Sequence, residues 1–265
     1  MDYLRVDAKG GFMPRQRRLS PKERKLLKRK QGKGTLDTKF SMRDISPMTD
    51  TQEDMFDSYR AGYNIAAIGT AGTGKTMCGL YLGLSDILND DDYDQVIIVR
   101  SAVQTREQGF MPGTQAQKEA VYAVPYADIV NNLFGRGDAW EILKQKHSVK
   151  FMTSSFVRGL TFDNSIIIVD ECQSMTYHEL DSIITRVGDS SRIIFCGDTA
   201  QDDLAGTRHK HDISGLAEFI KVLTRMDHSF KIVQFGIEDI VRSGLVKEYI
   251  IAKEKQTTRP LAMTA

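Results

Sequence analysis

Short runs of apolar and β-branched residues alternate along the chain with segments whose apolar residues recur at helical spacing. Strands are predicted at 64–68, 96–99, 165–169 and 192–196, with a weaker candidate at 150–152 and an edge strand at 230–235. Helices are predicted at about 51–61, 74–88, 115–134, 176–187, 214–224 and 237–243. Continuous apolar runs such as 96–99 are typical of parallel strands covered on both faces. The alternation therefore predicts an α/β fold, a mostly parallel sheet with helices on both faces.

A phosphate-binding loop follows the first predicted strand. It reads Gly69-Thr70-Ala71-Gly72-Thr73-Gly74-Lys75-Thr76 and fits the pattern G-x-x-x-x-G-K-[ST]. Glycines let backbone N–H groups converge on phosphate oxygens, and the N-terminus of the next helix adds positive potential. We expect 69–77, including Met77, to bind ATP, with Lys75 at the β- and γ-phosphates and Thr76 on Mg²⁺. The alternative is an ordinary glycine-rich turn; the loop interpretation makes the fold a RecA-like P-loop NTPase.

An acidic pair follows the most apolar predicted strand. Residues 166–169 lead directly into Asp170 and Glu171, which is the form of a Walker B element. A carboxylate at the end of a buried strand can hold Mg²⁺ beside Thr76, and Glu171 can orient an attacking water or accept its proton. The alternative is an acidic pair that begins a surface helix. Together with the loop, the pair predicts hydrolysis rather than nucleotide binding alone.

Two glutamines are further candidates for nucleotide contacts. The strand at 192–196 leads into Gly197-Asp198-Thr199-Ala200-Gln201, which resembles the γ-phosphate-sensing segment of helicases. The amide of Gln201 can bond a phosphate oxygen and the catalytic water, with a lesser role for Asp198. Gln52 lies 17 residues before the loop, and its amide can bond the adenine edge. A simple turn and a solvent-facing glutamine are the respective alternatives.

Charge is distributed unevenly, although the net charge is only +1. Residues 15–33 contain ten Lys or Arg and one acid, Glu23, so the rest of the chain is acidic. Such an arm suits the phosphate backbone of a nucleic acid; a solvated tail is the alternative. We therefore divide the chain into a basic arm at 1–40, an ATPase domain at 41–255 and a C-terminal tail at 256–265.

Composition indicates a cytoplasmic protein. No apolar run reaches the roughly 18 residues that span a membrane, and the N-terminus has no apolar signal-peptide segment. Three cysteines, Cys78, Cys172 and Cys196, are widely spaced without the spacing of metal ligands. Buried reduced thiols are expected at these positions.

These ordered motifs make the chain similar to the PhoH family, which is related to superfamily 1 helicases. The similarity extends from about Thr49 to Ala252. The blocks that carry it are Gly69–Thr76, Val99–Val103, Gln108–Gly113, Val157–Phe162, Ile168–Gln173, Thr185–Gly188, Gly197–Gln201 and Ile240–Arg242. Thr70, Ser101 and Cys172 depart from the usual Pro, Pro and Ala of the family. The compact form with a basic arm resembles the phage-encoded branch, which would place the protein in the host cytoplasm.

The resemblance implies ATP hydrolysis coupled to RNA or single-stranded DNA. Arg100 follows a predicted strand, and Arg158 lies in a Gly-flanked turn just before the Walker B strand. Both are candidate nucleic-acid contacts, with a solvated or structural arginine as the alternative for each. Two rival functions remain open. One is an ATP-dependent kinase or other small-molecule phosphotransferase, and the other is a nucleotide-gated nucleic-acid-binding protein with little turnover.

A chain with room for one RecA-like lobe raises the question of which residue supplies the arginine at the γ-phosphate. A neighbouring subunit in a homo-oligomeric ring, such as a hexamer, could supply it. Arg242 matches the late arginine block of the family and is the first candidate, and Arg186 is the second. The alternative for Arg242 is a structural ion pair with Glu238 or Asp239.

Overall fold

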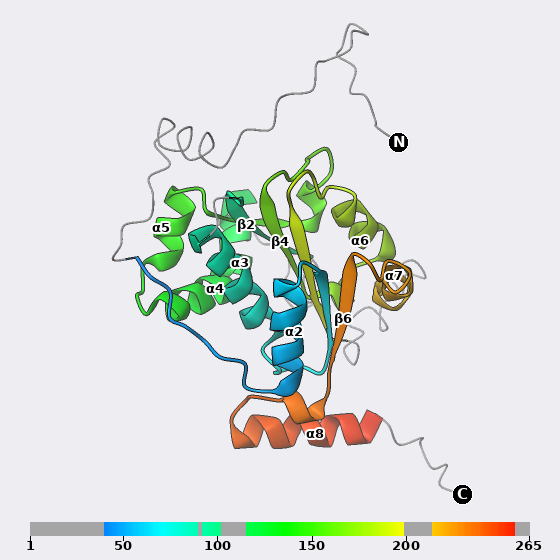
Figure 1. Ribbon diagram of the computed structural model, residues 1–265. Helices are drawn as coiled ribbons and strands as arrows, with labels where there is room; N and C mark the ends of the chain where they lie inside the picture. The colour runs from blue at the N-terminus through cyan, green and yellow to red at the C-terminus, as the bar shows by residue number, and fades with distance from the viewer. Residues whose placement is uncertain (1–39, 90–91, 102–114, 199–213, 258–265) are drawn as a thin grey trace, which may run out of the picture. The chain divides into compact units, whose positions relative to one another are not determined.

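The computed structural model describes residues 40–89, 92–101, 115–198 and 214–257, and within them lies a sheet of six parallel strands (Figure 1). The order across the sheet is β3-β2-β4-β5-β1-β6. The strands are β1 (Asn64–Gly69), β2 (Gln95–Arg100), β3 (Val149–Thr153), β4 (Ser165–Asp170), β5 (Arg192–Gly197) and β6 (Phe230–Phe235). All six predicted strands are confirmed, and the two weakest signals, β3 and β6, form the two edges.

Seven α-helices and three 3₁₀ turns accompany the strands in the described residues. The helices are α2 (Asp50–Arg60), α3 (Lys75–Asn89), α4 (Gln115–Phe134), α5 (Ala139–Gln145), α6 (Tyr177–Ile184), α7 (Leu216–Leu223) and α8 (Gly244–Thr257). The 3₁₀ turns are η1 (Ser154–Phe156), η2 (Cys172–Ser174) and η3 (Ile237–Asp239). Among these described helices, none has the length and apolarity that crossing a membrane requires.

The predicted helix at 237–243 is wrong. Only the single turn η3 forms there, because the Asp239 carboxylate accepts the N–H of Gly236 at 2.9 Å and Ile240 is extended. The chain then enters α8, which was not predicted. Among residues 244–253, whose side chains the structure describes, none is buried, and Leu245 and Tyr249 are exposed. This part of α8 therefore has no buried apolar stripe for a sequence pattern to report.

Helices cover both faces of the sheet, and the apolar run of β4 has side chains on each. Ile166 and Ile168 pack with residues of α3, α4 and α5. Ile167 and Val169 pack with residues of α6 and α7 on the other face. A third cluster joins α2 and α3 to β1, β5 and β6. This arrangement confirms the RecA-like α/β fold predicted from the alternating pattern.

The parallel order brings functional segments to one edge of the sheet. The carboxyl ends of β1, β4 and β5 lie there, where the chain continues into the glycine-rich loop, into Glu171 and into Asp198. Ligands of open α/β sheets bind at this edge. The basic arm except Phe40, the block Gln108–Gly113, Gln201 and residues 258–265 lie outside the described residues.

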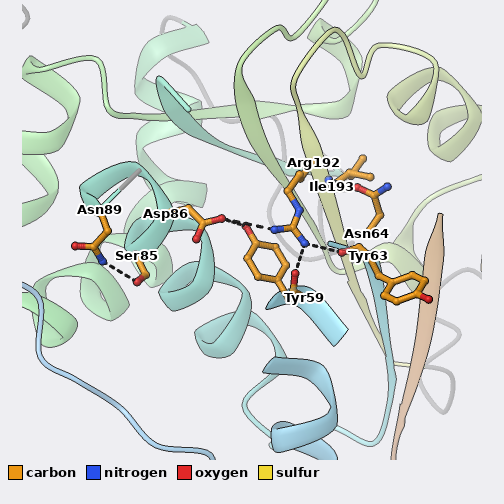
Figure 2. A network of polar contacts seen from close by, with 8 residues as sticks. All are labelled: Tyr59, Tyr63, Asn64, Ser85, Asp86, Asn89, Arg192 and Ile193. Atoms are coloured by element: carbon orange, nitrogen blue, oxygen red, sulfur yellow. Dashed lines mark hydrogen bonds and ion pairs between the residues drawn. The ribbon is translucent and has the colours of Figure 1, made fainter. Parts of the chain in front are cut away.

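At the amino ends of the strands, opposite the loop, Arg192 makes a network of contacts between neighbouring elements (Figure 2). Its guanidinium lies 3.5 Å from the ring centroid of Tyr59, and its Nη2 donates to the backbone carbonyls of Tyr59 and, at 2.8 Å, of Tyr63. The Tyr59 hydroxyl donates to Asp86 at 2.7 Å, and burial raises the pKa of Tyr59. This network joins α2, α3, β1 and β5 at the amino ends of the strands, away from the loop.

Candidate nucleotide-binding site

The phosphate-binding loop leaves β1 and enters α3 with left-handed backbone at three glycines. Gly69, Gly72 and Gly74 have φ of 132°, 76° and 83°. A Cβ on Gly69 would collide with the carbonyl of Phe235, and one on Gly72 would lie 2.9 Å from Cγ of Arg242. These three positions therefore need glycine for conformation, and two of them need it for space as well.

Lys75 is folded into the loop that precedes it. Its Nζ donates to the carbonyls of Gly69 at 2.8 Å and Thr70 at 2.6 Å, and to Oγ1 of Thr73 at 3.2 Å. Burial lowers the pKa of Lys75, and the surrounding thiol and carboxyl groups oppose that shift. The ammonium group thus lies where phosphate oxygens would compete with the loop carbonyls for it.

Asp170 is held between two hydroxyl groups. Thr76 Oγ1 donates to its Oδ1 at 2.8 Å, and the Tyr126 hydroxyl donates to its Oδ2 at 2.9 Å. Burial raises the pKa of Asp170, whereas the two hydroxyl bonds, the N–H of Glu171 and the charge of Arg100 lower it. Tyr126 was missed from the sequence, because a tyrosine at helical spacing on α4 predicts core packing and nothing more.

The pair of Thr76 and Asp170 suits a magnesium ion. A hydroxyl and a carboxylate are hard oxygen donors, and Mg²⁺ is usually bound through one or two carboxylates together with substrate phosphates and water. The described residues contain no group of three or more His, Cys, Asp or Glu able to hold a metal. The two predicted ligands, Thr76 and Asp170, lie in direct hydrogen-bond contact.

Glu171 follows Asp170 in the left-handed conformation, with φ of 54°. This backbone turns the chain away from β4 and into η2. Oε2 of Glu171 accepts a hydrogen bond of 2.5 Å from Nε2 of Gln173, a buried residue that the sequence did not single out. Asp198, at the end of β5, is also buried.

Gln52 lies against the loop, in the first turn of α2. Its Oε1 accepts the N–H of Met48 at 2.8 Å, and its Nε2 donates to the carbonyl of Thr73 at 2.9 Å. A Cβ on Gly74 would lie 3.1 Å from the same Nε2. Gln52 is buried and supports the loop; its predicted contact with adenine would use the remaining donor hydrogen and lone pair of the amide.

Arg242 lies on the loop of its own chain. The Val241 N–H donates to the carbonyl of Gly72 at 3.1 Å, and Cδ1 of Ile250 in α8 would lie 3.2 Å from a Cβ on Gly72. Among the described residues, no ion pair joins Arg242 to Glu238 or Asp239. Arg242 is therefore beside the phosphate-binding loop in cis, before any partner subunit is considered.

The other three candidate arginines differ in their surroundings. The guanidinium carbon of Arg100 lies 6.0 Å from the ring centroid of Tyr122. The charge of Arg100 also lowers the pKa of Asp170. Arg158 is exposed, and its Nη2 is 2.6 Å from Nε2 of His178. Arg186 follows α6, and its Nε is buried without a hydrogen-bond partner in the described part of the chain.

Known proteins similar to this chain carry one family name. The model of the family described as PhoH-like protein matches residues 44–254. The protein PhoH of Escherichia coli is 31% identical over 215 residues, which are 79% of this chain and 59% of that protein. The PhoH-like protein of Bacillus subtilis is 32% identical over 193 residues, 72% of this chain and 58% of its own length. This chain spans about three fifths of the curated relatives that it matches.

Solved structures with lower similarity include two phage proteins. The UvsW helicase of bacteriophage T4 aligns with 83% of this chain and 69% of its own, at 16% identity and a TM-score of 0.45. The large terminase of a thermophilic bacteriophage, in complex with ADP, aligns with 81% of this chain and 51% of its own, at 12% identity and a TM-score of 0.44. The family assignment comes instead from the family model and from the relatives of about 30% identity. This chain belongs to the PhoH-like protein family.

Proposed function

We propose that this protein binds ATP with Mg²⁺ and hydrolyses ATP, and that hydrolysis is coupled to RNA or single-stranded DNA. The observation that carries the proposal is the convergence of Lys75, Thr76, Asp170 and Glu171 at one edge of the sheet. Thr76 and Asp170 are 94 residues apart in sequence, yet Oγ1 of Thr76 lies 2.8 Å from Oδ1 of Asp170. A phosphate-binding loop beside a Walker B pair supplies the groups that transfer of a phosphoryl group to water requires.

Binding of the triphosphate is assigned to the loop and Lys75. The loop N–H groups and the start of α3 surround the β- and γ-phosphates, and Lys75 exchanges its bonds to the Gly69 and Thr70 carbonyls for phosphate oxygens. The exchange is favourable because a charged oxygen is a stronger acceptor than a carbonyl. Thr76 and Asp170 would hold Mg²⁺, and the ion would supply charge neutralisation at the transferred phosphate.

Activation of the attacking water is assigned to Glu171. Its carboxylate orients the water and accepts the proton, and the fixed backbone of η2 keeps it beside Asp170. Gln201 senses the γ-phosphate, and Arg242 stabilises the charge that develops on it. The position of Arg242 against Gly72 supports this role within one chain. A ring in which Arg242 or Arg186 acts on a neighbouring subunit is the second arrangement that we propose to test.

Coupling to a nucleic acid is assigned to the basic arm, Arg100 and Arg158. The charge of the arm supports contact with a phosphate backbone. Arg158 supports it through its exposed position at the carboxyl edge of the sheet, and Arg100 through its proximity to Asp170. A cytoplasmic location, in a host cell if the chain is encoded by a phage, and the relationship to superfamily 1 helicases belong to the same proposal.

Phosphate release and nucleotide affinity, measured on the full chain with and without polynucleotide, test the proposal. Lys75→Ala should abolish ATP binding. Glu171→Gln should keep the affinity for ATP but lower kcat by about 10²- to 10⁴-fold, the usual contribution of a general base. Lys144→Ala and Glu141→Gln, which change an exposed pair on α5, are matched controls that should leave both quantities unchanged.

The rival functions predict different results in the same assay. ADP formation that requires a small-molecule acceptor and releases no phosphate would identify a kinase. Binding of ATP that alters the affinity for polynucleotide without turnover would identify a nucleotide-gated binding protein. Normal turnover by Glu171→Gln would refute the assignment of the base.

A further inference from the structure

The side chain of Gln173 joins two segments of the site. Its Nε2 donates to Oε2 of Glu171 at 2.5 Å, and its Oε1 accepts the backbone N–H of Asp198 at 2.9 Å. Gln173 is only 2% exposed, so water does not replace these partners easily. One buried amide therefore connects the residue after β4 with the residue after β5.

The orientation of this amide is fixed by its two partners. A backbone N–H can only donate, so Oε1 of Gln173 must face Asp198, and the NH₂ group must then face the carboxylate of Glu171. The reversed amide would oppose two donors at one end and two acceptors at the other. The bond to Glu171 is also assisted by the carboxylate charge, which makes it stronger than a neutral hydrogen bond.

The backbone of η2 positions Gln173 for this contact. Glu171 is left-handed, and the N–H of Ser174 donates to its carbonyl at 2.9 Å. This tight turn returns the side chain of Gln173 to the carboxylate two residues before it. On β5, a Cβ at Gly197 would lie 3.2 Å from Cβ of Cys172 and 3.6 Å from Oε1 of Gln173. Glycine at 197 thus permits the close approach of the two segments.

We propose that Gln173 is a positioning residue, which holds the carboxylate of Glu171 in place and couples it to the backbone of Asp198. The inference rests on the function proposed above, in which Glu171 orients the attacking water and accepts its proton. A general base must hold the attacking water at a defined angle, so the rate of hydrolysis falls when its carboxylate can rotate. A movement of the segment after β5 would shift the amide of Gln173 and, through it, the carboxylate. The amide neither binds the nucleotide nor takes the proton.

Turnover of three variants tests the positioning role. Gln173→Met keeps the volume and loses both bonds, and it should lower kcat by about 10- to 100-fold, less than loss of the base itself, with KM for ATP changed by less than about 3-fold. Gln173→Glu keeps an acceptor for Asp198 but repels Glu171, and should lower kcat at least as much. Gln95→Met, which loses a bond to Ser165 at the amino edge of the sheet, is the control and should retain wild-type kcat.

A purely structural role gives a different pattern. If Gln173 only supported the backbone of Asp198, Gln173→Glu would retain kcat, and Gln173→Met would lose stability and kcat together. In a Glu171→Gln background, Gln173→Met should cause little further loss of single-turnover rate, because the group that it positions is already inactive. Multiplicative losses, or kcat within about 2-fold of wild type for Gln173→Met, would overturn the inference.

Amide hydrogen exchange tests the coupling without any need for hydrolysis. In the nucleotide-free full chain, Glu171→Ala removes the anchor of Gln173, and the Asp198 amide should exchange about 5- to 10-fold faster, as expected for one weakened hydrogen bond. Gln173→Met should do the same, and Gln95→Met should not. Unchanged exchange in Glu171→Ala would refute the coupling even if the protein hydrolyses ATP. A wild-type chain that shows the coupling but no turnover would refute the proposed ATPase instead.

Discussion

The energetic cost of adding a methyl group at Gly72, where Arg242 and Ile250 of α8 lie close, can be measured with a series of Gly→Ala variants. At Gly137, φ is not positive and nothing lies within 4 Å of an added Cβ. At Gly62 the space is also open, but φ is 99°. At Gly72, φ is 76° and the Cβ would lie 2.9 Å from Cγ of Arg242. The three positions therefore add the backbone strain and the steric clash one at a time.

The expected free energies of unfolding follow from this geometry. Gly137→Ala should be neutral or stabilising by up to about 1 kcal/mol, because the backbone already suits alanine. Gly62→Ala should cost about 1–2 kcal/mol for the left-handed conformation alone. Gly72→Ala should cost that strain plus about 1–3 kcal/mol for moving the stem of Arg242 and its neighbours on α8. Urea denaturation of each variant gives these values directly.

A double variant identifies the clash. Arg242→Ala deletes Cγ, the atom nearest to the added methyl, so Gly72→Ala should cost less in that background by about 0.5–3 kcal/mol. Gly62→Ala should cost the same in either background. If Gly72→Ala costs no more than Gly62→Ala, and Arg242→Ala does not lower that cost, Arg242 does not pack against Gly72.

Three further variants or treatments test other parts of the structure. Tyr126→Phe, which removes a donor to a buried carboxylate, should lower the free energy of unfolding by about 1.5–3 kcal/mol in urea; an unchanged value would contradict the hydrogen bond. Arg192→Met should cost about 2–4 kcal/mol but leave ATP affinity unchanged, because its two carbonyl partners lie at the far edge of the sheet. Burial raises the pKa of Cys78 to about 12, so at pH 8 the thiol is un-ionised in the fold, and iodoacetamide should label it only after unfolding. Fast labelling of the native protein would contradict its burial.

The sheet and the core of the site were predictable because their signals are local. Four β-branched or apolar runs produced β1, β2, β4 and β5, and three of them, β1, β4 and β5, lead directly into the functional motifs. Because parallel strands place their carboxyl ends together, the order of the motifs along the chain predicts that the phosphate-binding loop and Asp170 are neighbours. In the structure, Oγ1 of Thr76 lies 2.8 Å from Oδ1 of Asp170.

The supporting residues could not be predicted, because their partners are distant or ambiguous in sequence. Tyr126 lies 44 residues before Asp170, and its position on α4 is equally suited to apolar packing. Gln173 was visible only as part of a motif, and its bond to Asp198 crosses 25 residues. Gln52 was assigned to adenine from its spacing, whereas its carboxamide is bonded to the carbonyl of Thr73. Spacing identifies a candidate; it does not choose among its partners.

The position of Arg242 bears on whether a neighbouring subunit is needed to supply an arginine to the site. The prediction of a ring arose from the question of which residue supplies an arginine at the γ-phosphate. Yet the Val241–Gly72 hydrogen bond and the stem of Arg242 hold this arginine at the loop of the same chain. An arginine in cis can act without a neighbour, as it does in some nucleotide hydrolases. A rate per subunit that is independent of protein concentration, and that falls by about 10³- to 10⁵-fold in Arg242→Ala, would support action in cis. A rate that rises with concentration would require Arg242 or Arg186 to reach the site of a neighbouring subunit.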